Sequence, residues 1–460
     1  MHGGIMNDLV SLIRSSENKF DLYIILHKFL KASWHVCQGK IENLDKGESK
    51  KSIEFSKKLF HKDLSVIKEK LVSKLKNEEY IFVYHFLKTI ETEETDDLDS
   101  YSYRNNIYED EGLRIESGSA LNTKATHILG EIYAKKDSFL NNCIRKEDSF
   151  KTDKHIGENI KSIQEKLIVV ENSDSHFNRN IYKISDSYIN DRLKEKNDIR
   201  IVVVPFSSEI EFQKEIIKKN GKNYFDIKKI IDHSKYYKYL DIIFTKLEEV
   251  NADIIIFPEM IFNDEMYDYT RRKIRNLKNK FLMIIGGSIW KDNQNYLYIL
   301  NGAGLELTKL YKLNRFEGNG EIENLNISEK DELKIFDLND FGRFAVPICV
   351  DYITEDYFKI IKNTGVNSCF VPAYTSSLKK FILNSENLGS SNCGSVVVSN
   401  CCTAMKNKEK KKKTFIYIPH KTSSVNYLEC DGEECETCKK IYMLEASKIS
   451  KEINFRTINL

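Results

Sequence analysis

The stretch Phe344-Ala-Val-Pro-Ile-Cys-Val-Asp-Tyr352 decides how the rest of this chain is interpreted. Its first five residues are an apolar, strand-type run that ends at Cys349, and residues 354–361 begin like a helix. A buried strand that leads into a helix N-terminus places the sulfur near backbone N–H groups and the helix dipole, which favour a thiolate. The alternative is that Cys349 is a small buried hydrophobic residue, the usual fate of a free cysteine. Residues upstream of this stretch decide between the two.

Length and composition set the class of protein. The chain has 460 residues, enough for two domains, and its net charge of +2 gives no reason to expect a polyanionic partner for the whole protein. No apolar run approaches the ~18 residues of a membrane span, and the first residues lack a secretory signal pattern. Ten cysteines are too few for a disulfide scaffold. We expect a cytoplasmic protein with reduced thiols, and its lysine, asparagine and isoleucine content suggests a bacterial source.

The first part of the chain has the pattern of a helical domain. Its first 200 residues contain no proline, and apolar residues recur at helical spacing over 22–30 and 64–75. Residues 80–87 form a shorter apolar run that fits helix or strand, and a further helix is predicted around residues 160–170. We therefore predict a mainly α-helical domain over residues 1–197, of unknown role.

Residues 198–460 have a different pattern. Uniformly apolar strands at 201–206, 252–258, 281–287, 368–372 and 395–400 alternate with helical segments, and 296–301 with 305–310 reads as a strand pair. Such alternation is typical of an α/β domain whose mixed sheet is covered on its faces.

Three chemically active residues follow predicted strands in this second part. Glu259 follows Ile254-Ile-Ile-Phe-Pro258, Lys312 follows Leu310-Tyr311, and Cys349 follows the opening stretch. The carboxyl ends of strands are where open α/β sheets place their chemistry. A carboxylate can take the thiol proton, a thiolate can attack an sp² or sp carbon, and an ammonium can stabilise the resulting negative charge.

These residues also carry a family resemblance. Asp253-Ile-Ile-Ile-Phe-Pro-Glu259, Leu310-Tyr-Lys312 and Ile348-Cys-Val-Asp351 resemble, in order, the three signature blocks of the nitrilase, or carbon–nitrogen hydrolase, superfamily. The resemblance covers about residues 198–450. It implies a four-layer α-β-β-α sandwich with Glu259 as general base, Lys312 as stabiliser and Cys349 as nucleophile, and with the N–H of Val350 in the oxyanion site. It also implies a homodimer or larger homo-oligomer.

Members of this family often have a second glutamate soon after the lysine. Glu317, Glu321 and Glu323 all follow Lys312, and we favour Glu321, although each also fits an exposed loop acid. The usual histidine after the lysine is replaced by Asn314, and the blocks after Cys349 and before Asn392 depart from the family pattern. Since those positions shape the substrate pocket, subfamily specificity does not transfer.

Two late motifs allow further interpretations. Residues 406–413 hold six lysines, which form a solvated loop or contact an acidic partner or nucleic acid. Cys430, Cys435 and Cys438 are spaced like a metal knuckle, so they predict either a structural zinc site or reduced thiols in a surface hairpin. Catalysis itself requires no cofactor under either interpretation.

The expected activity is cysteine-dependent hydrolysis of a non-peptide C–N bond, of amide or carbamoyl type, through a covalent thioester. Acyl transfer from the same thioester to an amine is the alternative within enzymes. The competing class is a non-enzymatic scaffold or sensor whose helical domain binds a protein or nucleic-acid partner, in bacterial defence or signalling.

Overall fold

A computed structural model describes most of the chain in two compact units. The described residues are 3–16, 19–32, 46–77, 79–93, 107–110, 113–118, 131–134, 138–143, 167–170, 178–206, 211–231, 233–277, 281–318, 320–327, 332–392, 394–401, 411–419, 424–430 and 440–460. No described helix has the length and apolarity needed to cross a membrane.

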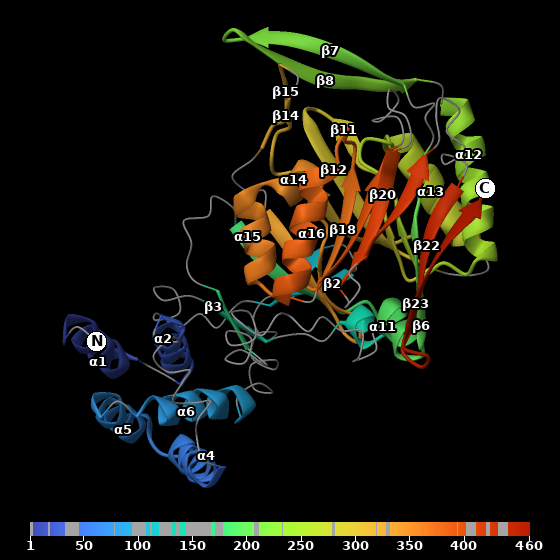
Figure 1. Cartoon of the computed structure of the whole chain (residues 1–460). Helices are drawn as coiled ribbons and strands as arrows, with labels where there is room; N and C mark the ends of the chain where they lie inside the picture. Colours follow the sequence, from blue (N-terminus) through green and yellow to red (C-terminus); the bar gives the residue numbers. More distant parts are fainter. Residues whose placement is uncertain are drawn as a thin grey trace. The chain divides into compact units, whose positions relative to one another are not determined.

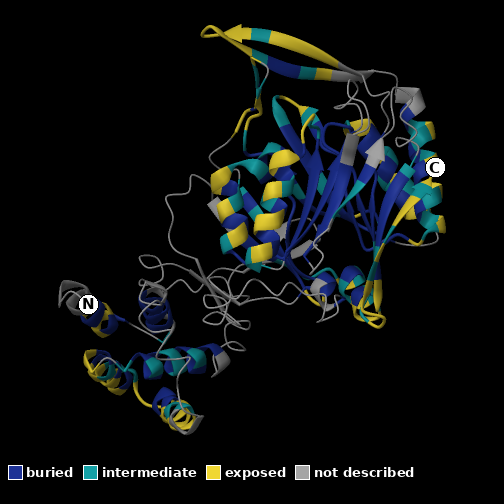
Figure 2. Ribbon diagram, in the orientation of Figure 1, coloured by how far each residue is buried: buried dark blue, intermediate teal, exposed yellow. Residues whose placement is uncertain are grey.

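The described helices of the first unit are α1 (Gly3–Ser15), α2 (Lys19–Ala32), α4 (Lys46–Phe60), α5 (Leu64–Lys76) and α6 (Tyr80–Glu93). Of these, α2 and α5 contain the two apolar stripes from which helices were predicted. Their apolar stripes meet in one core, in which Leu26, Ile67 and Phe86 are fully buried. Figure 2 shows buried residues on the inner faces of these helices and exposed ones on the outer faces. Residues 80–87, which fitted helix or strand, are helical.

The boundary between the units differs from the predicted position at residue 197. The described residues 107–110, 113–117, 138–143 and 178–197 belong to the second unit, and β1 (Ile107–Asp110), β2 (Leu113–Gly118) and β5 (Asn178–Ile184) are strands of one of its sheets. The helix predicted around residues 160–170 is also wrong at its end. β4 (Leu167–Val170) is a strand paired with β3 (Glu131–Ala134), as expected for consecutive β-branched residues.

The second unit is built on two large sheets. One has the order β11-β12-β10-β9-β6-β22-β23, with β13 paired to β12, and the other has the order β1-β2-β5-β16-β17-β18-β19-β20-β21. The first sheet comprises β6 (Asp198–Val203), β9 (Ile254–Ile256), β10 (Met283–Ile285), β11 (Ile289–Lys291), β12 (Gln294–Asn301), β13 (Glu306–Tyr311), β22 (Lys440–Ser447) and β23 (Glu452–Asn459). The second adds β16 (Glu332–Leu338), β17 (Gly342–Ala345), β18 (Ser368–Ala373), β19 (Ser395–Asn400), β20 (Lys411–Ile418) and β21 (Ser424–Cys430).

Helices cover the outer faces, which makes the predicted four-layer α-β-β-α sandwich (Figure 1). α12 (His233–Glu249) and α13 (Asp264–Asn276) pack on the first sheet, and α14 (Val350–Ile353), α15 (Glu355–Asn363) and α16 (Lys379–Asn392) lie on the second. The short helices α9 (Phe139–Asn142) and α11 (Ser187–Lys194) complete the unit. The hydroxyl of Ser399 joins the two sheets, because its Oγ lies 3.2 Å from the carbonyl oxygens of both Val204 and Ile256.

The sequence did not predict a small third sheet in this unit. β7 (Glu211–Lys219) and β8 (Lys222–Ile231) form a hairpin between β6 and α12. β8 also pairs with β15 (Glu321–Glu323), which in turn pairs with β14 (Glu317–Gly318).

A buried ion pair fixes β17, the strand that leads to Cys349. Arg343 Nε and Nη2 lie 2.6 and 2.9 Å from the two carboxylate oxygens of Asp337 on β16, and Arg343 Nη1 donates to the Thr364 carbonyl at 2.7 Å. Both charged side chains are almost fully buried. Each therefore depends on the other to offset its lost hydration.

Replacing one partner of this pair should destabilise the second unit strongly. We expect Arg343→Met to lower the free energy of unfolding by about 3–5 kcal/mol, because it leaves the Asp337 carboxylate buried without its cation. The double variant Arg343→Met/Asp337→Leu should regain most of the loss. Urea unfolding measures the stability of both variants. The control is Lys291→Met, which breaks the exposed Lys291–Asp264 pair and should lower the free energy of unfolding by about 1 kcal/mol or less. Equal losses of unfolding free energy in Arg343→Met and Lys291→Met would contradict this account.

Candidate active site

Glu259 lies just beyond the carboxyl end of β9. Its Oε1 accepts hydrogen bonds from Asn295 Nδ2 at 2.9 Å and from Lys312 Nζ at 2.8 Å, and its Oε2 accepts one from the Tyr374 N–H at 3.1 Å. The side chain is 1% exposed. Three hydrogen bonds from three different chain segments therefore fix this carboxylate, and the Glu259 N–H donates to the Ala373 carbonyl at 3.4 Å.

Lys312 follows β13 and holds its ammonium between two carboxylates. Its Nζ is 2.8 Å from Glu259 Oε1 and 2.7 Å from Glu323 Oε2, and the residue is 2% exposed. Burial alone would lower the pKa of Lys312, but the charges of Glu259 and Glu323 outweigh burial and raise it above its ordinary value. The ammonium is therefore a permanent positive charge in the site.

The second acid at Lys312 is Glu323, and the preference for Glu321 was wrong. Glu321 lies on the same strand but points away, to an ion pair with Lys214, and it is partly exposed. Glu323 is fully buried, and its Oε2 also accepts the Phe316 N–H at 2.8 Å. The two glutamates lie at opposite ends of β15, and only Glu323, at the carboxyl end, reaches the Lys312 ammonium. Burial raises the pKa of Glu323, and the Lys312 ammonium opposes that rise.

Cys349 occupies the turn between β17 and α14 with a strained backbone. Its φ of 51° and ψ of −107° lie in a region that non-glycine residues rarely adopt, as at a nucleophile elbow. Its N–H donates to the Pro372 carbonyl at 2.8 Å, which ties the turn to β18. The following helix is a single turn of four residues, so its dipole is small.

The cysteine is held as a thiol, contrary to the expectation that the helix favours a thiolate. Burial raises its pKa well above the ordinary value, and the Glu259 carboxylate raises it further. Lys312 and the Tyr374 N–H act in the opposite direction but do not compensate. The Glu259 carboxylate interacts with the thiol, so the base that could remove its proton is adjacent.

Asp351 connects the cysteine turn to the lysine loop. Its fully buried carboxylate accepts hydrogen bonds from the N–H groups of Leu313, at 3.1 Å, and Asn314, at 2.7 Å, and from Asn314 Nδ2 at 2.8 Å. Asn314, the departure from the family pattern, thus pairs with a residue two positions after Cys349. The link fixes the distance between Lys312 and the thiol.

Sequence reasoning missed Asn295, Tyr374 and the structural role of Asp351. Asn295 is a fully buried polar residue within the apolar strand β12, and that interruption of the pattern is a usable signal. Tyr374 acts through its backbone N–H, for which no residue type gives a signal.

The late motifs fall mainly outside the described residues. Cys435, Cys438 and residues 406–410 lie in ranges that the structure does not describe, and of Cys430 only the backbone pairing with Lys411 is described. Within the described ranges, no three histidine, cysteine or acidic side chains form a metal-binding group. The zinc site and the lysine-run contact stay predictions.

The raised pKa of Asp351 predicts how the stability of the protein depends on pH. Burial, its largest cause, raises that pKa from 3.8 to about 7. Between these values the folded protein keeps a proton that the unfolded chain has released, so this group's contribution to stability falls as the pH rises. In Asp351→Asn that loss is absent. We expect the free energy of unfolding of Asp351→Asn, relative to the unsubstituted chain, to increase by up to about 1.4 kcal/mol per pH unit between pH 4 and 7.

Urea unfolding at several pH values measures the difference. Asp268→Asn, at an exposed position on α13, is the matched control and should show no such trend. Parallel pH profiles for Asp351→Asn and the unsubstituted chain would contradict the buried, proton-retaining carboxyl.

Comparisons with known proteins give a low level of similarity. No protein-family model and no curated protein sequence matches the chain. One similar solved structure is a Saccharomyces cerevisiae member of branch 10 of the nitrilase superfamily, with 16% identity over 55% of this chain and 91% of that chain and a TM-score of 0.37. A second is a nitrilase-superfamily amidase from Nesterenkonia, with 9% identity over 55% of this chain and 91% of that chain and a TM-score of 0.37. A third is a CN-hydrolase superfamily protein from Xanthomonas campestris, with 13% identity over 56% of this chain and 93% of that chain and a TM-score of 0.36. In each case the similarity covers just over half of this chain.

Proposed function

We propose that the second unit is a cysteine-dependent hydrolase of a non-peptide C–N bond, of amide or carbamoyl type. The observation that carries this proposal is the buried cluster in which Glu259 contacts both the Cys349 thiol and the Lys312 ammonium. A base, a nucleophile and a fixed cation within one cluster are the groups that acyl transfer to a thiol requires.

The first half-reaction forms a thioester. Glu259 takes the Cys349 proton as the sulfur attacks the carbonyl carbon, because the thiol is otherwise held protonated. The oxyanion that forms is stabilised by the Lys312 ammonium and by the Val350 N–H, which lies at the first position of α14, where helical N–H groups have no partner within the helix. The C–N bond breaks as the amine leaves with the proton from Glu259.

The second half-reaction releases the acid. Glu259 removes a proton from water, the hydroxide adds to the thioester carbonyl, and the C–S bond breaks as the sulfur regains a proton. Glu323 keeps Lys312 aimed at the reacting carbon, since both of its oxygens lie within 2.8 Å of that ammonium. The 5% exposure of Cys349 supports a small substrate over a large one.

Loss of the base should abolish the reactivity of the thiol. We expect Glu259→Gln to slow alkylation of Cys349 by iodoacetamide by at least about 100-fold, the usual contribution of a general base. Peptide mass spectrometry compares this rate with those of the buried Cys143, Cys369 and Cys401. Glu355→Gln, at an exposed position on α15, is the control and should leave the rate unchanged.

Incubation with a panel of small aliphatic amides tests the reaction itself. An acyl mass on Cys349 that is absent in Glu259→Gln supports the proposal, and added hydroxylamine distinguishes water from amine as the acceptor. Equal alkylation of all cysteines, unaffected by Glu259→Gln, would refute the hydrolase and leave the scaffold alternative.

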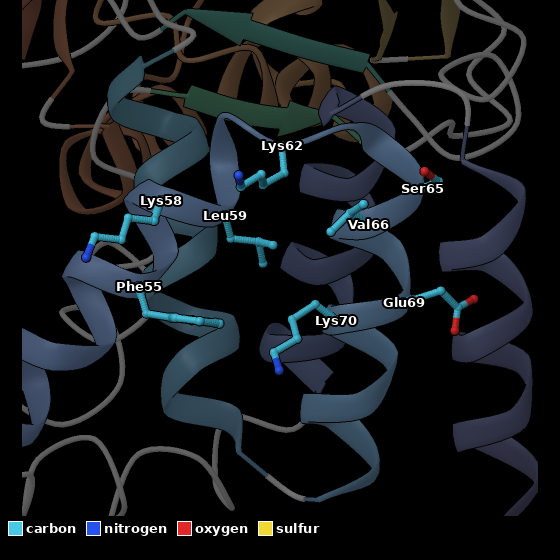
Figure 3. Close-up of a pocket in the computed structure, with 8 residues that line it drawn as sticks. All are labelled: Phe55, Lys58, Leu59, Lys62, Ser65, Val66, Glu69 and Lys70. Carbon is cyan, nitrogen blue, oxygen red and sulfur yellow. The ribbon is translucent and has the colours of Figure 1, made fainter.

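We propose a binding function for the first unit, because a groove lies between α4 and α5. Figure 3 shows its lining, in which the apolar side chains of Phe55, Leu59 and Val66 meet lysines on either side. The groove has a volume of about 710 Å³, and Phe55 and Val66 are 40% and 50% exposed. Large apolar side chains in a hollow surface are typical of helix-in-groove recognition.

The charge around the groove selects an acidic partner. Residues 46–76 contain ten lysines and four acidic residues in a chain whose total charge is only +2. Glu69, the one acid in the lining, pairs with Arg14 at 3.2 Å, so its charge is already offset. The occupant that fits is an acidic amphipathic helix of a partner protein.

A synthetic helical peptide with glutamates and a leucine stripe is the probe for this groove. We expect the full chain to bind it more tightly than a scrambled peptide of the same composition, and Val66→Asp to weaken binding at least about tenfold by placing a charge on the apolar floor. Fluorescence anisotropy measures both. Ile242→Asp, at the similarly exposed Ile242 on α12, is the matched control. Equal binding of the scrambled peptide, or binding of anionic vesicles in place of the peptide, would refute the proposal.

A further inference from the structure

The β7–β8 hairpin is connected directly to the strand that carries Glu323. β8 pairs in parallel with β15, and the register places Phe225 opposite Glu323. The pairing continues one residue further, where the Asn324 N–H donates to the Phe225 carbonyl at 3.0 Å. In Figure 1 this hairpin lies along one end of the second unit, with β14 and β15 beneath it.

Side chains reinforce this backbone pairing. Lys214 of β7 reaches across β8 to an ion pair with Glu321, two residues before Glu323. Lys219 Nζ donates to Asn324 Oδ1 at 3.1 Å, one residue after Glu323. The hairpin therefore holds the segment on both sides of Glu323.

The hairpin is itself anchored to the body of the unit. The Phe225 ring is 7% exposed and stacks on Trp290 of β11 at 6.4 Å between centroids. The Lys214 ammonium lies 4.3 Å from the centroid of the same ring, a cation–π contact that orients it toward Glu321. A continuous set of contacts thus runs from the first large sheet through the hairpin to β15.

We propose that the β7–β8 hairpin is a positioning arm that sets where Glu323 meets Lys312, with Lys214 as its positioning residue. β15 has three residues, and its partner on the other side, among the described strands, is the two-residue β14. Such a short strand has few bonds of its own, so its placement depends on the longer β8. A displacement of the largely exposed β7 by a contact on its surface would therefore be transmitted through the hairpin to the buried Glu323.

This inference rests on the proposed hydrolase, and a charge swap tests it. Lys214→Glu should repel Glu321 and slow Cys349 alkylation by iodoacetamide about two- to fivefold, the range that an exposed ion pair supports. The pH dependence of alkylation should shift as well, because Glu323 then fixes the Lys312 charge less well. Lys214→Glu/Glu321→Lys restores the attraction and should restore both the rate and the pH profile.

Lys218→Glu is the matched control, since it makes the same charge change at an exposed position of the same strand. The arm proposal is overturned if Lys214→Glu leaves the rate and the pH profile as they are, or if Lys218→Glu matches it. It is also overturned if the double variant stays as slow as the single one. Failure of the hydrolase has a different signature, because Glu259→Gln would then leave alkylation unchanged.

Discussion

The placement of one buried ammonium between two carboxylates constrains the rest of this site. Lys312 Nζ lies within 2.8 Å of Glu259 and of Glu323, and all three side chains are almost completely removed from water. Buried ions are tolerated only when their partners are well placed. β9, β13 and β15 must therefore place Glu259, Lys312 and Glu323 within hydrogen-bond distance of one another. A shift of any of these strands would leave a buried charge without its partner.

The same constraint explains the state of the cysteine. Burial is the main cause that raises the pKa of Cys349 and holds it as a thiol, and the charge of the Glu259 carboxylate adds to the effect of burial. A strained turn aims the sulfur, and Asp351 ties that turn to the lysine loop through three donors. The site is thus organised for proton transfer to Glu259 at the moment of attack, and a stored thiolate is not part of it.

The two units carry different kinds of surface. The second unit hides its reactive groups, while the first exposes Phe55 and Val66 in a lysine-rimmed groove. The described helices of the first unit share a continuous apolar core, on which the groove between α4 and α5 is built. Under the two proposed functions, one chain combines recognition of an acidic helix with hydrolysis of a small C–N bond.

Sequence alone determined the elements whose pattern is local. Proline-free helical stripes, uniformly apolar strands and the positions of Glu259, Lys312 and Cys349 at strand ends were all readable, because period and residue type record local burial. The tertiary structure decided what depends on contacts between distant segments. Glu323, and not Glu321, meets Lys312, because Glu321 pairs with Lys214 of the distant strand β7 while Glu323 lies within reach of the Lys312 ammonium. Two further features could not be predicted, because neither has a side-chain signature. Tyr374 contributes a backbone N–H to the site, and β5 joins a sheet of the second unit from within the predicted helical domain. The protonation of Cys349 likewise depends on burial and on neighbours far away in sequence.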